Sequence, residues 1–358
     1  MNLNKRNGCK NILSLVLALI TGLAFCACGD QTVEVEKTET SNLITVGFSQ
    51  IGAESDWRIA STSSMQSAFS VTMGYRLMYD DGQQKQENQL KAMREFIDSD
   101  VDYIVLDPIT ETGWDATLLE AKEAGIPVIL VDRQVSVEDD SVYTAWVGSD
   151  FHMEGKRACA WLDSYLKAVG YEGEVNIAHI QGTLESTAQI GRTEALIEAA
   201  DTNGWNIVAQ ESADFVQAKG KEVMEAMLLE YGDAINVVYC ENDSEALGAI
   251  EALKEAGKTP GADILNGEVL VISFDATKDG LEKTLTGEIV MNMECNPNYG
   301  VVAEKLISSL KNGNEIEHSY YMEESQFSAV EVISSVTVDD IDYEVTMLTR
   351  DLIDSRDY

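Results

Sequence analysis

The chain has 358 residues, 45% of them hydrophobic, and its 62 acidic against 25 basic side chains give a formal net charge of −37. This acid excess argues against nucleic-acid binding, which needs clustered cations facing phosphates, and against a polybasic membrane contact. The length and the hydrophobic content suffice for two compact domains of ordinary size.

The N-terminus has the features of an export signal. Basic residues precede an apolar run at 12–25, which is too short for a comfortable membrane span. The run ends in Leu-Ala-Phe-Cys-Ala-Cys-Gly-Asp, which resembles a bacterial lipobox. Cys28 follows a small residue and Cys26 a bulky one, so we expect Cys28 to carry the lipid anchor, although Cys26 remains an alternative. We therefore expect a signal peptide through the anchor at 1–28, a flexible polar tether at 29–42, and a location at the outer face of the cytoplasmic membrane or in the periplasm.

The body of the chain offers no pattern typical of a metal site. Cys159, Cys240 and Cys295 match neither a zinc spacing nor a disulfide framework, and the three histidines form no metal-binding motif. Because three is odd, at least one of these thiols should be free and packed as a small apolar residue. We expect no metal centre.

From residue 44 onward, short β-rich runs alternate with helical patterns, which is typical of βαβ units and a parallel sheet. The first set has expected strands at 44–48, 103–106 and 127–131, and helices from the loop end at 54–58 through 68, at 83–97 and at 112–124. A strand at 142–147 leads toward a second, similar set. In that set we expect strands at 175–180, 205–209, 236–240, 269–274 and 287–293, and helices at 153–168, 186–200, 216–231, after 243 and at 301–310. The pattern predicts an α/β fold with two doubly wound parallel-sheet lobes.

The loop after the first strand is rich in groups that suit a sugar. Trp57 supplies a flat apolar face, Arg58 a fork of donors, and Glu54 and Asp56 acceptors. Such a strand-to-helix loop lies at the carboxyl edge of a parallel sheet, where ligands bind. The alternative is a surface turn with Trp57 buried beneath it.

Polar residues also follow later strands. Asp132 and Arg133, Asn242, and Asp275 each come just beyond a strand end, so two facing lobes would bring them to one cleft with the first loop. The alternatives are a surface ion pair for Asp132 and Arg133 and a helix cap for Asp275.

Several stretches resemble bacterial sugar-binding proteins of the type I periplasmic-binding fold, the ribose-binding group, and within it the galactofuranose-binding members. They are VGFSQIGAESDWR, DGQQKQENQLKAMREFI, DPITETGW, AGIPVILVDRQ, QGTLESTAQIGR, SADFVQAKGKEVM, ENDSEALGAIEALKEAG and ISFDATKDG. The resemblance implies two lobes joined by a hinge. We expect the N-terminal lobe to hold 43–147 and roughly 296–325, and the C-terminal lobe 148–295 and roughly 326–358.

The resemblance further implies a monomeric, lipid-anchored solute-binding component of an ABC sugar importer, which closes around a monosaccharide and docks on a membrane permease. A furanose hexose such as galactofuranose is the favoured ligand, and no cofactor is implied. The alternative is an extracytoplasmic sensor that presents its sugar to a membrane receptor or histidine kinase. Glu54 and Asp56 are two nearby carboxylates of the kind that glycosidases use, but no matching partner or nucleophile motif accompanies them, so we expect no enzyme.

Carried over from the family, the ligand contacts fall on Glu54, Ser55, Asp56, Trp57, Arg58, Asp132, Arg133, Arg192, Phe215, Asn242 and Asp275. A structural ion pair is the alternative for Arg192, and core packing the alternative for Phe215. Two departures argue against ribose: Ile190 stands where ribose binders carry an arginine, and Cys295 stands near the position of their glutamine.

Overall fold

The structure is a computed structural model that describes residues 43–358. The signal peptide, the anchor cysteine and the tether predicted for residues 1–42 lie outside the described residues.

A six-stranded, all-parallel sheet forms the centre of what we call the first lobe, with the order β11-β5-β4-β3-β1-β2. Its central strands are short and wholly apolar, because both faces of the sheet are covered by helices. The strands are β1 (Ile44–Gln50), β2 (Tyr75–Asp81), β3 (Tyr103–Leu106), β4 (Val128–Val131), β5 (Ala145–Gly148) and β11 (Ser319–Tyr321).

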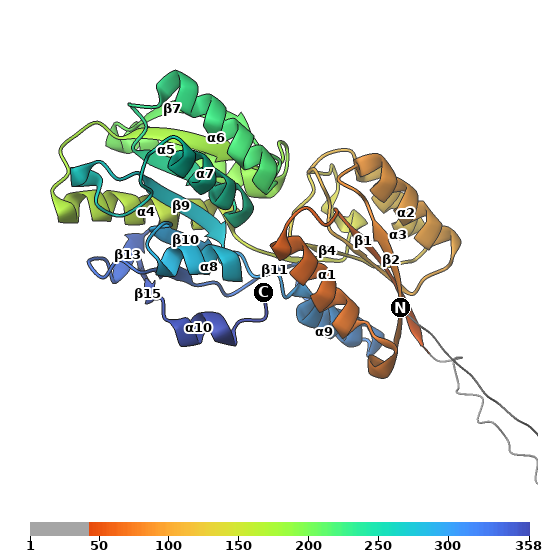
Figure 1. Cartoon of the computed structure of the whole chain (residues 1–358). Coiled ribbons are helices and arrows are strands. Elements are labelled where there is room, and N and C mark those ends of the chain that lie inside the picture. The colour runs from red at the N-terminus through yellow and green to blue at the C-terminus, as the bar shows by residue number, and fades with distance from the viewer. Residues whose placement is uncertain (1–42) are drawn as a thin grey trace, which may run out of the picture. The chain divides into compact units, whose positions relative to one another are not determined.

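Helices cover both faces of this sheet (Figure 1). Adjacent residues of β3 point to opposite faces: Val105 packs in the cluster beneath α1 (Asp56–Ala68) and α9 (Tyr299–Lys311). Ile104 and Leu106 pack beneath α2 (Gln86–Asp98) and α3 (Asp115–Glu123). Because these helices lie on the faces of the sheet, they leave the carboxyl ends of the strands uncovered.

A seven-stranded sheet forms the centre of the second lobe, with the order β15-β12-β10-β9-β8-β6-β7. Its pairs are parallel except for β10 with β12. The strands are β6 (Asn176–Gln181), β7 (Asn206–Ser212), β8 (Val237–Cys240), β9 (Leu270–Asp275), β10 (Met291–Glu294), β12 (Gln326–Ser328) and β15 (Thr346–Met347).

The second sheet is covered in the same way. Val237 and Tyr239 face α4 (Phe151–Val169) and α5 (Thr187–Asn203). Val238 and Cys240 face the other side, which is covered by α6 (Gln217–Tyr231), α7 (Asp243–Glu255) and α8 (Lys278–Leu285). The smaller elements are η2 (Val71–Met73), η3 (Asp140–Val142), η4 (Ile264–Asn266), the hairpin β13 (Ser335–Val338) and β14 (Ile341–Glu344), and α10 (Arg350–Ser355).

Two predicted strands begin later than expected. The run at 142–147 starts in the 3-10 turn η3, and its strand begins only at Ala145. The run at 287–293 becomes a strand only at Met291, because Gly287, with φ of +80°, belongs to the turn that ends α8.

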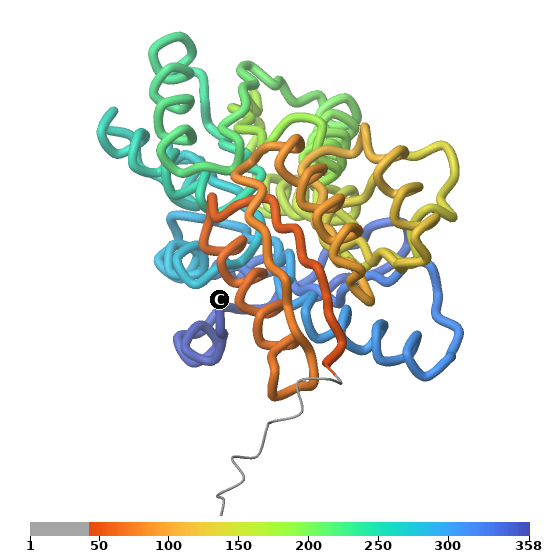
Figure 2. The backbone as a smooth tube through the Cα atoms, turned by 90° about the vertical axis from the view of Figure 1, so that its right-hand side faces the viewer, coloured from red at the N-terminus to blue at the C-terminus, as the bar shows by residue number. Residues whose placement is uncertain are grey.

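The chain passes between the two sheets at three places, which lie between the left and right lobes of Figure 1; in Figure 2 the first lobe is nearer the viewer. The interlobe segments are 149–150 after β5, 295–298 after β10, and 322–325 between β11 and β12. This topology confirms the predicted α/β fold with two parallel sheets, and the helix-covered sheets leave their strand ends available for a site.

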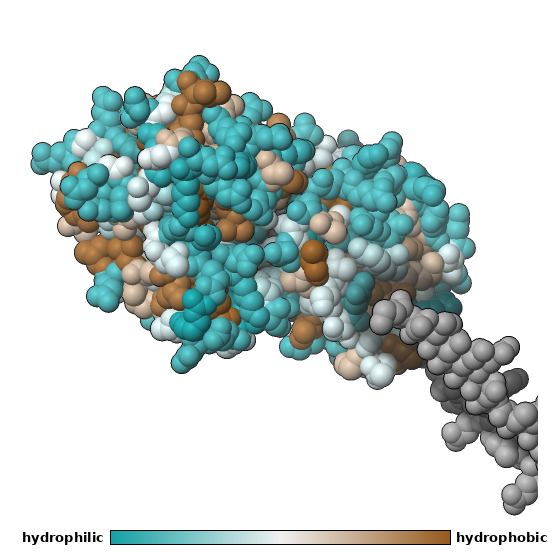
Figure 3. Space-filling view, viewed as in Figure 1, coloured by the Kyte–Doolittle hydropathy of each residue, from teal (hydrophilic) through white to brown (hydrophobic). Residues whose placement is uncertain are grey.

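The face of the molecule in Figure 3 is mainly hydrophilic, with scattered hydrophobic side chains, as the acid-rich composition leads one to expect. Across residues 43–358, the helices are too short or too polar for any of them to span a bilayer.

Candidate ligand-binding cavity

A small cavity lies between the two lobes, at the carboxyl ends of their strands, with about 300 Å³ of space free of protein atoms when the adjoining open solvent is included. Ten of the eleven predicted site residues line it; Asp56, in the exposed first turn of α1, does not. The lining residues are Glu54, Ser55, Trp57, Arg58, Asp132, Arg133, Phe151, Ala188, Arg192, Phe215, Asn242, Asp275 and Cys295.

The start of α1 fixes the first wall. Ser55 caps the helix by accepting a hydrogen bond from the backbone N–H of Arg58, which sets the direction of the first turn. Trp57 is only 4% exposed, and its Nε1 donates to the backbone carbonyl of Cys295 over 2.6 Å. Its ring meets Tyr299 edge-on, with centroids 5.9 Å apart. Trp57 is therefore both packed and part of the cavity wall.

Arg58 is the centre of a buried ion network. Its Nε donates to Glu54 over 3.0 Å, and its Nη1 donates to Asp132 over 3.0 Å and also to Asp107. Burial alone would lower the pKa of Arg58, but the carboxylates, Asp107 foremost, raise it well above its usual value. Burial raises the pKa of Asp107 well above its usual range, and Arg58 opposes this shift. Arg58 thus holds Glu54 and Asp132 in place as cavity walls.

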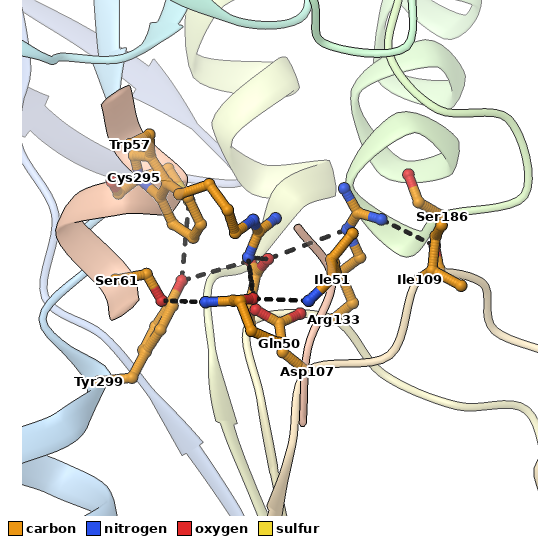
Figure 4. Close-up of polar contacts among 12 residues, drawn as sticks. Gln50, Ile51, Trp57, Ser61, Asp107, Ile109, Arg133, Ser186, Cys295 and Tyr299 are labelled. Atoms are coloured by element: carbon orange, nitrogen blue, oxygen red, sulfur yellow. Dashed lines mark hydrogen bonds and ion pairs between the residues drawn. The ribbon is translucent and has the colours of Figure 1, made fainter. Parts of the chain in front are cut away.

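Asp132 and Arg133 are 3% and 1% exposed, so the alternative of a surface ion pair is wrong. Arg133 donates from Nη1 to the carbonyl of Ile109 over 2.7 Å, a contact drawn in Figure 4. Its guanidinium carbon lies 5.3 Å from the ring centroid of Phe215, which belongs to the second lobe. Burial, and next the charge of Arg58, lower the pKa of Arg133. Arg133 therefore faces the opposite lobe across the cavity.

Arg192, inside α5, supplies the cation of the second lobe. It donates from Nε to Glu154 over 2.8 Å and from Nη1 to the backbone carbonyl of Glu241. Its Nη2 lies 3.7 Å from Asp275, whose pKa is raised well above its usual range by burial. The expected alternative, a structural ion pair, is thus present, and Arg192 lines the cavity as well.

The two remaining polar residues close the far side of the cavity. Asn242 caps α7 by accepting the N–H of Glu245 over 2.8 Å, and its amide donates to the carbonyl of Phe215 over 3.3 Å. Asp275 does not cap α8, as the alternative proposed, because Thr277 fills that position.

Three lining residues have left-handed backbones: Asp132 at φ +61°, Phe215 at +63° and Asp275 at +96°. Such conformations cost of the order of 1–3 kcal/mol for a bulky residue, and they concentrate at functional sites. Gly182 makes room for one of them, because a Cβ there would stand 1.9 Å from the Phe215 ring. The cavity is therefore built at a cost in local strain.

Some of the surrounding residues were not predicted. Phe151, Ala188 and Cys295 complete the wall, while Asp107 and Glu154 hold the arginines from behind. Asp107 follows β3 directly, so the strand-end pattern could have identified it. Glu154 lies within α4 and carries no such signal.

Buried polar atoms without a hydrogen-bond partner in residues 43–358 include Glu54 Oε2 and Arg133 Nε, which both belong to lining residues of the first lobe. Nη2 of Arg192, on the second lobe, forms an ion pair with Glu154 over 2.8 Å. Since buried polar groups are rarely left unpaired, the atoms of Glu54 and Arg133 are available to a polar ligand.

The lobes also contact each other around the cavity. The N–H of Glu111 donates to the carbonyl of Glu185 over 3.0 Å, and the N–H of Gln134 donates to the hydroxyl of Thr187 over 3.1 Å. These bonds show that the cavity is closed in this structure.

The body cysteines Cys159, Cys240 and Cys295 are buried free thiols, which confirms the prediction for at least one of them. Among the described residues, Glu154, Cys295 and Glu324 place potential metal-ligating atoms within 4.8 Å of one another, beneath the cavity. Glu154 is paired with Arg192, and Glu324 accepts two hydrogen bonds, so these carboxylates have structural partners.

Residues 46–312 match the family described as periplasmic binding protein domain. The galactofuranose-binding protein of Escherichia coli is 41% identical over 258 residues, 71% of this chain and 78% of that protein. It and other similar proteins are binding proteins, which confirms the expectation that the chain is not an enzyme.

Two solved structures are also similar. A Mycobacterium smegmatis protein in complex with β-D-fucofuranose aligns with a TM-score of 0.75 at 38% identity, over 81% of this chain and 92% of that one. The binding component of the arabinose ABC transporter of Shewanella sp. ANA-3, bound to L-arabinofuranose, aligns with a TM-score of 0.73 at 37% identity, over 79% and 91%. With its two parallel sheets around a closed cavity, the chain belongs to the periplasmic binding protein family.

Proposed function

We propose that this protein binds one monosaccharide, a furanose hexose such as galactofuranose, in the closed cavity and delivers it to an ABC importer. The observation that carries the proposal is the set of charged and polar side chains that both lobes contribute to one cavity, with unpaired atoms at Glu54 and Arg133.

The composition of the wall suits a sugar ring. Carboxylates at Glu54, Asp132 and Asp275 accept hydrogen bonds from hydroxyl groups, while Arg133 and Arg192 donate them. Trp57 and Phe215 offer apolar surface to the C–H groups of the ring. A ligand with hydroxyls on several sides would pair with both lobes at once.

The preference for a furanose rests on the relatives. The three similar proteins described above are a galactofuranose-binding protein, a complex with fucofuranose and a complex with arabinofuranose. The importer is favoured over a sensor because one of these proteins is the binding component of an ABC transporter.

The proposed mechanism is hinge closure. A sugar bound to one lobe would satisfy atoms of the other lobe only when the lobes close, so it would shift the population toward the closed state. The closed protein, held at the membrane by a lipid on Cys28, would then present the sugar to its permease.

Calorimetric titration with D-galactose, L-arabinose, D-fructose and D-ribose tests the ligand class. We expect galactose or arabinose to bind most tightly, and a clear preference for ribose would reject the proposal. NMR of galactose labelled with carbon-13 at C1 would then identify the ring form in the complex. A bound pyranose would reject the furanose assignment while leaving monosaccharide binding intact.

A further inference from the structure

The three interlobe segments meet at one side chain, that of Glu324. Its Oε1 accepts hydrogen bonds from the hydroxyl of Ser149 and, over 2.8 Å, from the backbone N–H of Asn296. Ser149 belongs to the first interlobe segment, Asn296 to the second, and Glu324 to the third. One carboxylate oxygen therefore joins all three connections between the lobes.

The same contacts lead to the cavity wall. The hydroxyl of Ser149 lies 3.4 Å from that of Tyr299, and the Tyr299 hydroxyl lies 3.5 Å from Oδ1 of Asp132. The hydroxyl of Ser149 also lies 3.3 Å from the thiol of Cys295. Asp132 and Cys295 both line the cavity, so the tie at Glu324 reaches two of its walls.

The third segment is held at its main chain as well. The backbone carbonyl of Glu324 accepts a hydrogen bond from Nη2 of Arg157 over 3.4 Å. The next residue, Ser325, donates its N–H to Glu294 over 2.7 Å and accepts the N–H of Glu294 over 3.0 Å. The carboxylate of Glu324 is thus placed by its surroundings, and it is not free to follow either lobe alone.

We propose that Glu324 is a positioning residue for sugar binding, which fixes the three interlobe segments in the closed arrangement and thereby places Asp132 and Cys295 against the sugar. The inference deepens the proposed function, because it assigns a residue outside the cavity to the closure step. Since affinity depends on the free energy of the closed state relative to the open one, loss of the tie would weaken binding without removing a ligand contact.

The test compares Glu324→Ala, Glu324→Gln and the matched control Glu323→Ala in the full-length protein. Glu323 is the exposed neighbour of Glu324 in the same segment. Two quantities are measured. One is the dissociation constant of the sugar that binds most tightly in the calorimetric titration, and the other is the rate of hydrogen exchange at single backbone amides. The Asn296 amide reports the tie itself, and the Glu111 amide reports closure, because it is bonded across the cleft.

We expect Glu324→Ala to raise the dissociation constant by about 5- to 100-fold, the usual effect of leaving buried donors unpaired. Exchange at Asn296, and in the free protein at Glu111, should accelerate. Glu324→Gln keeps an oxygen acceptor at the same position and should recover most of the affinity. If Glu324 acted only through its negative charge, Glu324→Gln would bind the sugar as weakly as Glu324→Ala.

The proposal is overturned if Glu324→Ala matches Glu323→Ala in affinity and in exchange at Asn296. If Glu324→Ala does not fold, Ser149→Ala removes one arm of the tie, and unchanged affinity and exchange in it would equally overturn the proposal. If the unaltered protein binds none of the sugars, the proposed function fails. Hydrogen exchange at the Asn296 and Glu111 amides, compared between Glu324→Ala and Glu323→Ala, then still decides whether Glu324 holds the three interlobe segments together.

Discussion

The indole N–H of Trp57 donates to the backbone carbonyl of Cys295 over 2.6 Å, which joins residues 238 positions apart in the chain. The bond connects the start of α1 to the second interlobe segment. It fixes the plane of the indole ring, whose surface lines the cavity. The aromatic wall of the cavity is therefore tied to a segment that must change when the lobes move apart.

Trp57→Phe separates the two roles of this side chain. The phenyl ring keeps an apolar face, but the buried carbonyl of Cys295 loses its donor, which costs about 1–3 kcal/mol of unfolding free energy. We expect sugar affinity to fall less than about tenfold, whereas Trp57→Ala, which removes the wall, should lower it about 100-fold. Urea unfolding and calorimetry measure the two effects.

Trp161→Phe is the matched control, because Trp161 is equally buried but stacks on Tyr165 within the second lobe, with centroids 5.0 Å apart. It should lower stability and leave affinity unchanged. Equal losses of affinity in both Phe variants would show that the effect at Trp57 is general destabilisation.

Arg133→Ala should abolish measurable sugar binding while the protein stays folded. The change removes the unpaired Nε of the cavity and the donor to the Ile109 carbonyl, whereas Asp132 keeps its partner Arg58. We expect at least a 100-fold loss by calorimetry, because charge-assisted hydrogen bonds are lost from a buried site. Arg133→Lys should not restore binding, since an ammonium lacks the planar fork.

Arg94→Ala serves as the control for Arg133, because Arg94 is exposed and pairs with Glu120 away from the cavity. The Arg94→Ala variant should bind the sugar with the same affinity as the unaltered protein. Unchanged affinity in Arg133→Ala would remove Arg133 from the site.

The position of the cavity was predictable because parallel strands end at one edge of a sheet. The apolar runs of β3 and β4 are unambiguous, and polar residues follow them directly, as with Asp132 and Arg133. The loop after β1 likewise follows a strand end, and it also contains the aromatic residue Trp57. Eight of the predicted residues line the cavity for this reason, whereas Arg192 and Phe215 were predicted from the family resemblance.

What could not be predicted depends on contacts between distant segments. β2 is an edge strand whose sequence, YRLMYDD, lacks a regular alternation of apolar and polar residues, so the pattern does not mark it. The partners of Arg192 and Trp57 lie 38 and 238 positions away. Asp56 was included because it belongs to the loop, but the first turn of α1 directs it outward to solvent.

Gly182→Ala should displace the Phe215 wall. A Cβ at position 182 would stand 1.9 Å from the Phe215 ring, closer than any real contact, so the ring must leave its place. We expect a loss of sugar affinity of at least about tenfold, together with lower stability, since overpacking typically costs about 1–3 kcal/mol. Calorimetry and thermal unfolding measure these changes.

Phe215→Ala in the same background tests the cause. Because the clash disappears with the ring, the double variant should be more stable than Gly182→Ala alone, although it still lacks the wall and binds weakly. If the double variant instead loses as much stability as the two single variants together, no clash links the two residues.

Cys28→Ser should release the protein from the membrane fraction, because a hydroxyl cannot form the thioether that holds the lipid. The basic and apolar regions of the export signal are unchanged, so the variant should still be exported and should appear in the soluble extracytoplasmic fraction. Cys26→Ser is the matched control, and it should stay with the membrane, because Cys28 follows the small residue that such sites prefer. Fractionation with immunoblotting distinguishes the two, and release by Cys26→Ser alone would move the anchor to Cys26. Sugar affinity should be the same in both variants, since the proposed contacts to the sugar are made by residues between Glu54 and Cys295.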